Sequence, residues 1–593
     1  MNLRNFWMTT LLLTLGVTSA QAKKEKYPAA PALTPEQNAL IKKAIAAEKL
    51  TIKGIQQKSP LVQTYIQNMK GDAKLYAVPV SDQYMLQRVD FGKTFYGKAY
   101  STGEASEASH GMFKGSLAAM GLLSKSLLPG NVRYMPDGFL EMMFIDPSGF
   151  DQQHYDFISV RKAFLGTVRC DVFDVHPKPG LGNGRFTGRI WVDDDSGNVV
   201  RFNGTYTGGD MADKADDNDY FHFDSWRQNL QPGVWLPVGV YVEETSKKDK
   251  EHPVSFKAHT SIWGYSLKVP THQSDNESVK IDDVTDQSQN SEDVSPLQAQ
   301  REWISQAEEN VLDRLTQAGL LAAPSDFDKV LEQVTNNIII GNNIELAAPV
   351  HCRVMLTMPL ESIAVGNTII LSKGLVDTLP TEEALASVLS FQLAHIVLGH
   401  HIDTKYAFND RLLFPDESTF ERIQMHHTDG DDIEAAKKAV VLIDHSIYKD
   451  KMNNAGLYFA QLQQREKELS ALNTPRLGDS ILDSTGQPWL IAIQKRAPKL
   501  DQDKLDQIAA LPLGSRLRTD AWDDKVYTLK TTAPVLLNAR DKMPFEVTPV
   551  YYKLVRYDQA QSAAGAQAST QQQPAQPAQP DQASAQPAAP PQQ

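Results

Sequence analysis

Cysteine is nearly absent from this chain of 593 residues, which has only Cys170 and Cys352, far apart in sequence. Two cysteines can build neither a disulfide framework nor a cysteine-rich zinc site. A disulfide between them would need an oxidising compartment. We expect instead two buried free thiols in different domains.

Long apolar segments are also missing. After the first 22 residues no stretch approaches the roughly 20 apolar residues that a membrane helix needs, so we predict no transmembrane segment. Basic residues are in deficit, because 59 Lys and Arg stand against 72 Asp and Glu, for a net charge of −13. This charge argues against nucleic acid as a partner.

The N-terminus has the pattern of an export signal. A charged start is followed by the short apolar run Leu11–Val17 and by Ala20-Gln21-Ala22. These features predict a signal peptide over residues 1–22, cleaved after Ala22. The run is too short to span a bilayer, and no cysteine follows it to carry a lipid. We therefore expect a periplasmic or secreted protein.

Composition marks the ends of the domains. Residues 558–593 consist almost entirely of Ala, Gln, Pro and Ser, without aromatic or basic residues, which predicts a disordered tail. Residues 271–297 are rich in Asp, Ser, Gln and Asn and read as a linker. Residues 476–557 predict a small C-terminal α+β or β appendage, with a helix at 501–510 and strands at 526–529 and 547–552.

Residues 74–270 have the pattern of a β domain. Runs such as 189–192 and 199–202 are separated by turn residues, which predicts an antiparallel, strongly curved sheet. The preceding segment, 23–73, is predicted to be helical from Thr34-Pro35-Glu36, where a cap, a first-turn proline and an acidic residue coincide, to about Met69.

The strand and tryptophan pattern of this domain resembles LolA-like periplasmic lipoprotein-carrier domains over Val89 to Leu267. The residues that carry the resemblance are Arg189-Ile190-Trp191-Val192-Asp193, Val199-Val200-Arg201-Phe202, Trp226 and Pro232–Pro237. It implies a half-barrel whose concave apolar face holds a lipid or another hydrophobic ligand. The alternative is a curved sheet covered by its own helices, without a ligand.

Residues 298–475 are mainly helical in pattern, and the chemistry concentrates there. Thr381 can cap a helix whose first turn holds two glutamates, which suit the helix dipole. From Ala384 to Leu398 this helix is apolar nearly all round, which predicts burial at the centre of a domain. Gln392 and His395 are the polar exceptions.

This helix, with the lead-in Ile363–Val376, resembles the zinc metallopeptidase family M forty-eight, the prenyl-protein proteases and their periplasmic relatives. The lead-in matches the family's edge strand and following turn. In active members the helix carries H-E-x-x-H, where two imidazoles bind zinc and the glutamate activates the metal-bound water. The same five positions in this chain are Phe391, Gln392, Leu393, Ala394 and His395.

The resemblance therefore implies lost zinc chemistry. Phe391 cannot bind a metal, and Gln392 lacks the carboxylate that would accept a proton from water. His395 is intact. His400 is five residues further on and would point about 140° away if the helix continued.

The family's third ligand comes from a later helix with a Glu-x-Glu-Ala-Asp pattern, which 432–436 resembles. Asp432 then stands at the ligand position, and the alignment could also shift to Glu434. Ala436 replaces the supporting aspartate. Thr474 replaces the histidine of the family's His-Pro turn.

The sequence therefore predicts a multidomain α+β protein, in which a curved β half-barrel precedes a metallopeptidase-like domain. We expect no catalytic residues and no cofactor, and a partner that is an envelope protein or peptide held in the old substrate cleft. His395, Asp432 and Glu434 are vestigial metal positions. Two alternatives stay open: an active zinc metalloendopeptidase using His426 or His427 with His395 and Asp432, or a lipid or lipoprotein carrier.

Overall fold

The computed structural model describes residues 32–72, 76–91, 96–99, 136–147, 149–181, 185–206, 221–244, 256–265, 296–402, 425–500, 517–520, 525–528 and 554–557. Five predicted features lie outside them: the signal peptide, nearly all of the linker, the helix at 501–510, the strand at 547–552 and the C-terminal tail. These five stay predictions.

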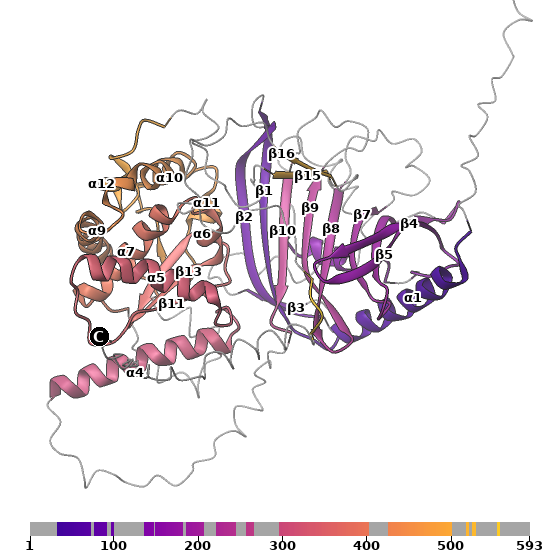
Figure 1. Ribbon diagram of the computed structural model, residues 1–593, viewed down its shortest axis with the longest axis horizontal. Coiled ribbons are helices and arrows are strands. Elements are labelled where there is room, and N and C mark those ends of the chain that lie inside the picture. The colour runs from indigo at the N-terminus through magenta and orange to yellow at the C-terminus, as the bar shows by residue number, and fades with distance from the viewer. Residues whose placement is uncertain are drawn as a thin grey trace, which may run out of the picture.

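A large antiparallel β-sheet and a mainly helical domain lie side by side in Figure 1. The sheet has ten strands in the order β3-β2-β1-β10-β9-β8-β7-β6-β5-β4. The strands are β1 (Leu61–Asp72), β2 (Tyr76–Asp90), β3 (Tyr96–Ala99), β4 (Tyr155–Leu165), β5 (Val168–Pro177), β6 (Phe186–Asp193), β7 (Val199–Tyr206), β8 (Phe221–Gln231), β9 (Val234–Glu244) and β10 (Phe256–Trp263). The predicted α+β class with its antiparallel β domain is confirmed.

The N-terminal helix begins where the sequence predicts but ends earlier. α1 (Pro35–Ile55) starts with a capping box in which the Thr34 and Gln37 side chains each accept the other's backbone N–H. The helix does not reach Met69, because Pro60 disfavours helical backbone at the residue before it. The chain then enters β1, so the prediction of helix over 61–69 was wrong.

β1 lacks the alternation that identifies a strand, because both of its faces are buried. Val62 and Ile66 join the apolar cluster beneath α1. Leu61 and Tyr65, on the opposite face, join clusters shared with the helical domain. Because both faces are buried, apolar residues occur on each of them and the period-two pattern is lost.

The face that carries Val62 and Ile66 is covered by the chain itself. Ile41 of α1 and Phe139 of the 3-10 helix η1 (Pro136–Met143) are fully buried in the same cluster. Among the described residues, this face matches the alternative of a sheet covered by its own helices. A hydrophobic ligand of the β domain stays a prediction.

The helical domain contains a four-stranded sheet in the order β11-β13-β12-β14. The lead-in Ile363–Val376, predicted to hold an edge strand, forms the hairpin of β12 and β13, and neither strand lies at an edge of this sheet. The elements are α4 (Pro296–Gln317), α5 (Asp326–Gly341), β11 (His351–Met355), β12 (Glu361–Val365), β13 (Thr368–Ser372), α6 (Lys373–Thr378), α7 (Glu382–Leu398), α9 (Asp429–Asp444), η3 (Lys449–Lys451), α10 (Met452–Gln464), α11 (Ser470–Asn473), β14 (Asp479–Ser480) and α12 (Ile491–Gln494).

This domain extends past its predicted end at residue 475. β14 pairs with β12 through Ser362 and Asp479, and Ile493 is fully buried in the helical core. The segment 554–557 instead packs on the β domain, where the Leu554 carbonyl accepts the Thr167 N–H at 3.0 Å. The predicted appendage at 476–557 is therefore divided, and the hairpin of β15 (Leu517–Asp520) and β16 (Lys525–Thr528) is its described remainder.

Direct hydrogen bonds join the two domains. The Gln63 side chain of β1 accepts the Met358 N–H at 2.9 Å, and the Trp263 indole donates to the Gly319 carbonyl at 2.8 Å. Elsewhere, Cys170 and Cys352 are buried free thiols, as predicted. No described helix is long and apolar enough to cross a membrane.

A pH-dependent contribution to stability arises near this interface. Burial, reinforced by the positive charge of Lys373, lowers the pKa of His259 on β10 from 6.5 to about 3. Below pH 6.5 the unfolded chain therefore binds a proton that the folded chain does not, and stability falls as the pH falls toward 3. We expect His259 to contribute roughly 1 kcal/mol of loss per pH unit. Urea unfolding between pH 7 and 4 should show a flatter profile for His259→Gln, and identical profiles would contradict this assignment.

Candidate functional site

The candidate site is built around α7, whose sequence fixes both of its ends. Thr381 caps the first turn by accepting the Ala384 N–H, and Gly399 ends the helix in the left-handed conformation, with φ of 73°. All side chains from Glu383 to His395 are buried. The predicted central, buried helix is therefore confirmed.

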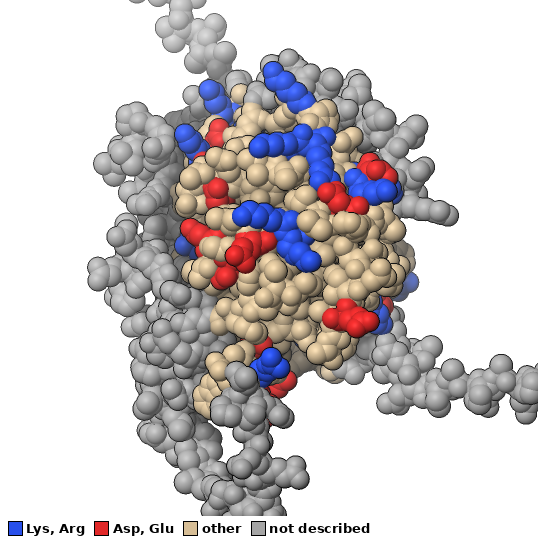
Figure 2. Space-filling view, turned by 90° about the vertical axis from the view of Figure 1, so that its left-hand side faces the viewer, with Lys and Arg blue, Asp and Glu red and all other residues tan. Residues whose placement is uncertain are grey.

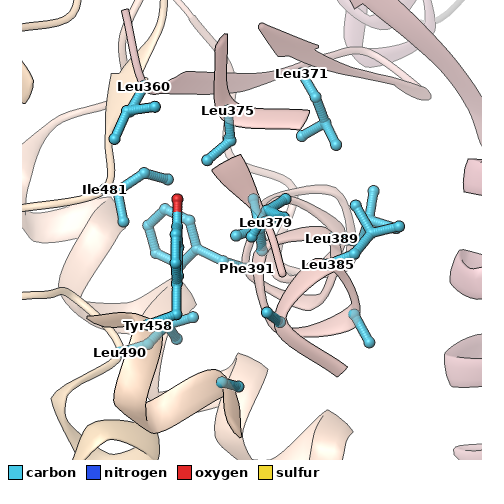
Figure 3. Packing of buried hydrophobic residues seen from close by; sticks show 14 of the residues in the cluster. Leu360, Leu371, Leu375, Leu379, Leu385, Leu389, Phe391, Tyr458, Ile481 and Leu490 are labelled. Atoms are coloured by element: carbon cyan, nitrogen blue, oxygen red, sulfur yellow. The ribbon is translucent and has the colours of Figure 1, made fainter. Parts of the chain in front are cut away.

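Phe391 belongs to the apolar core of the helical domain. Its side chain is 2% exposed and lies in the cluster that Figure 3 shows with Leu360, Leu375 and Tyr458. Its ring meets the His395 imidazole edge-on, with 5.0 Å between the ring centroids. The first position of the degenerate motif thus serves packing.

Gln392 links α7 to the sheet of the domain. Its fully buried amide nitrogen donates to the Ser362 hydroxyl at 2.9 Å and to the Asp479 carboxylate at 3.3 Å. Its carbonyl oxygen has no hydrogen-bond partner. The position that holds a glutamate base in the resembling family therefore holds an oriented amide.

Four ionisable side chains converge beside Gln392. His395 comes from α7, His427 from the residue before the α9 N-cap, Asp432 from the first turns of α9 and Asp479 from β14. One ligand-type atom of each lies within 4.8 Å of the others, and all four side chains are buried. The two imidazoles stack with ring centroids 3.8 Å apart. We call these four residues the His–Asp cluster.

Both imidazoles of the cluster make a hydrogen-bond contact through Nδ1. Asp479 accepts the backbone N–H of His427 at 2.7 Å and contacts its Nδ1 at 2.8 Å. A carboxylate only accepts, so the Nδ1 of His427 carries a proton. Nδ1 of His395 lies 3.1 Å from Nδ1 of His400.

His400 does not point away, as a continuing helix would require. The left-handed Gly399 reverses the chain at the end of α7 and returns the imidazole of His400 to that of His395.

Three polar atoms of the cluster are buried without a hydrogen-bond partner. His395 Nε2, His427 Nε2 and Asp432 Oδ1 are buried and make no hydrogen bond. His395 Nε2 and Asp432 Oδ1 are 3.4 Å apart. Buried polar atoms are nearly always hydrogen-bonded, so three such atoms side by side call for an explanation.

Burial disfavours charge on two members of the cluster. It lowers the pKa of His395 to about 4, and the neighbouring His427 adds to this effect. It raises the pKa of Asp432 to about 8, and repulsion from Asp479 adds to that rise. At neutral pH His395 is therefore neutral and Asp432 is mostly protonated.

The structure brings together only some of the predicted positions. His395 and Asp432 meet in the cluster, whereas the Glu434 side chain is 68% exposed and lies 3.8 Å from His400. Thr474 is exposed and donates to the Ser470 carbonyl. His426 is exposed and bonds to a backbone carbonyl, so His427 is the member of that pair that joins the cluster.

Sequence reasoning missed Asp479. It lies in a two-residue strand and belongs to no motif. Its only local signal is its position shortly after the Thr474-Pro475 turn.

Comparisons with solved structures find distant likenesses, and other comparisons find none. No family model and no curated protein matches the chain. A solved LolA superfamily protein from Nitrosomonas europaea is similar at 13% identity and a TM-score of 0.21, over 41% of this chain and 97% of that one. A DUF1329 family protein from Desulfovibrio piger is similar at 10% identity and a TM-score of 0.19, over 40% and 96%.

A third solved structure, the MucA/MucB complex of Pseudomonas aeruginosa, is similar at 10% identity and a TM-score of 0.12, over 37% of this chain and 94% of that one. Likenesses at these TM-scores assign neither a ligand nor an activity. The metallopeptidase resemblance of the helical domain stays a prediction from sequence.

Proposed function

We propose that this chain is an exported cell-envelope protein that binds a protein or peptide partner and does not hydrolyse it. The observation that carries the proposal is Gln392, whose amide donates to Ser362 and Asp479. In the metallopeptidase family that this segment resembles, the glutamate at that position takes a proton from water. An amide cannot take that proton.

Two further features support binding without hydrolysis. Phe391 packs in the core and Thr474 faces solvent, so neither side chain supplies a metal ligand or a general base at the His–Asp cluster. Figure 2 shows the side of the helical domain turned away from the large sheet, where acidic and basic side chains are interspersed over an uncharged surface. Such a surface suits a protein partner better than a strongly charged polymer.

The first test is proteolysis by the full-length mature chain. We expect unfolded casein, incubated with the protein and equimolar zinc, to stay intact by mass spectrometry, because the Gln392 amide cannot accept a proton from water. His395→Ala serves as the matched control. Cleavage by the wild type that disappears in His395→Ala would overturn the proposal.

The carrier alternative has a different signature. Native mass spectrometry of the same preparation, purified without detergent, should give the mass of the polypeptide without a bound lipid. A stoichiometric co-purified lipid would favour the carrier function.

A further inference from the structure

We propose that His395, His427 and Asp432 bind one divalent cation of the zinc type, with Asp479 orienting His427. Three observations carry this assignment: three unsatisfied buried atoms, a fitting donor set and a supporting shell of hydrogen bonds. The assignment goes beyond the proposed function, since a cation site can exist without hydrolysis.

The unsatisfied atoms are all of a kind that binds metals. Two imidazole nitrogens and one carboxylate oxygen, each buried and without a hydrogen bond, lie within 4.8 Å of one another. Zinc favours such a set, and sites with three protein ligands leave a fourth position for water or another ligand. Imidazole also suits cobalt and nickel, so the donor set defines a class of cation rather than one metal.

One spacing fits a single ion directly, whereas the stacked imidazoles, with ring centroids 3.8 Å apart, would have to spread to roughly 5 Å to bind the same tetrahedral ion through both Nε2 atoms. Two ligands at about 2.0–2.1 Å from a tetrahedral zinc are about 3.3 Å apart. The observed separation of His395 Nε2 from Asp432 Oδ1 is 3.4 Å. These two atoms do not form a hydrogen bond, so a cation between them would replace no existing bond of theirs.

The surrounding hydrogen bonds have the form expected around metal-binding histidines. Such histidines commonly donate their outer N–H to a carboxylate, which fixes the tautomer and the ring orientation. His427 does so to Asp479, and Asp479 is held in turn by the Gln392 amide. Gln392 cannot act as a base, and its amide instead acts as a positioning group for Asp479.

His427 supplies the ligand that Phe391 cannot. In an H-E-x-x-H helix both imidazoles come from one helix, one turn apart. Here one imidazole comes from α7 and the other from the residue preceding the N-cap of α9, and the two rings stack at 3.8 Å. The site therefore combines His395 and Asp432, which stand at ligand positions of the resembling family, with a histidine from a different segment.

Metal content tests the assignment directly. The untagged mature chain, stripped with a chelator and reconstituted with zinc alone, should hold one zinc per chain by plasma mass spectrometry. His427→Ala and Asp432→Ala should each weaken zinc binding at least 100-fold in chelator competition. His426→Ala, next in sequence but exposed, should bind as the wild type does. Asp479→Asn should weaken binding by about 10–100-fold without abolishing it.

A second measurement separates lost binding from lost folding. Cobalt in place of zinc should give the visible absorption bands of a low-symmetry tetrahedral site, and these should vanish in His427→Gln while near-ultraviolet circular dichroism stays unchanged. Absence of stoichiometric zinc and cobalt in the folded wild type would overturn the assignment, as would wild-type affinity in His427→Ala. Casein cleavage would instead overturn the proposed function and leave the metal site standing.

Discussion

Replacing Glu48 by Gln should lower the free energy of unfolding by about 3–5 kcal/mol. Glu48 of α1 and Arg227 of β8 form a two-pronged ion pair, with N–O distances of 2.5 and 2.8 Å. Both side chains are at most 1% exposed and lie within the core beneath α1. Loss of the carboxylate leaves a guanidinium charge buried without its counter-charge, which is far costlier than loss of a surface pair.

The ion pair also joins several parts of the β domain. Arg227 donates to the Met143 carbonyl at the end of η1 and to the Val199 carbonyl of β7. Glu48 also accepts the Ile145 N–H. Loss of the ion pair should therefore destabilise both the packing of α1 and the segment after η1.

Urea unfolding followed by tryptophan fluorescence measures the effect. Asp444→Asn, which breaks a more exposed pair with Arg496, is the matched control and should cost less than about 1 kcal/mol. The double variant Glu48→Met with Arg227→Met should recover most of the loss, because apolar replacement of a buried pair is often neutral. Equal losses for Glu48→Gln and Asp444→Asn would contradict this account.

Replacing Asp82 by Ala should destabilise the junction between the domains by about 3 kcal/mol. The Asp82 carboxylate on β2 accepts the backbone N–H groups of Ala471 and Leu472, both at 2.8 Å, and the Tyr65 hydroxyl at 3.1 Å. Burial raises the pKa of Asp82, and these hydrogen bonds oppose the rise. Without the carboxylate two N–H groups of the helical domain lose their acceptor, at about 1–3 kcal/mol each.

Hydrogen exchange locates this effect. Peptides that cover α11 and β2 should exchange faster in Asp82→Ala, while peptides from the far strands β5 and β6 should not change. Asp82→Asn keeps one acceptor oxygen and should give an intermediate result. Unchanged exchange at α11 in Asp82→Ala would show that the carboxylate does not hold the domains together.

Tertiary burial changed the sequence interpretation most clearly at β1. Apolar and polar residues do not alternate along this strand, because both faces are buried: Val62 faces α1 and Tyr65 faces the helical domain. The predicted end of the helical domain at residue 475 was wrong for a related reason. β14 has only two residues, and its place beside β12 depends on pairing with a strand more than a hundred residues earlier.

Local chemistry was sufficient for the features that depend on neighbours in the chain. Thr34 and Thr381 cap helices through N–H groups three residues on, and the apolar circumference of α7 requires a central position. The sequence by itself thus predicted the export signal, determined the buried helix and placed an amide rather than a carboxylate at Gln392. Each of these features depends only on residues that are close in the sequence.

The tertiary structure alone decided how the His–Asp cluster is composed. His395, His427 and Asp479 come from segments separated by tens of residues, and no spacing rule links them. Folding places His427 beside His395 because α9 packs along α7, and it places Asp479 behind His427 because β14 pairs with β12. The helix motif at Phe391 therefore gives no sign of the second imidazole, which the fold brings to His395 from another segment.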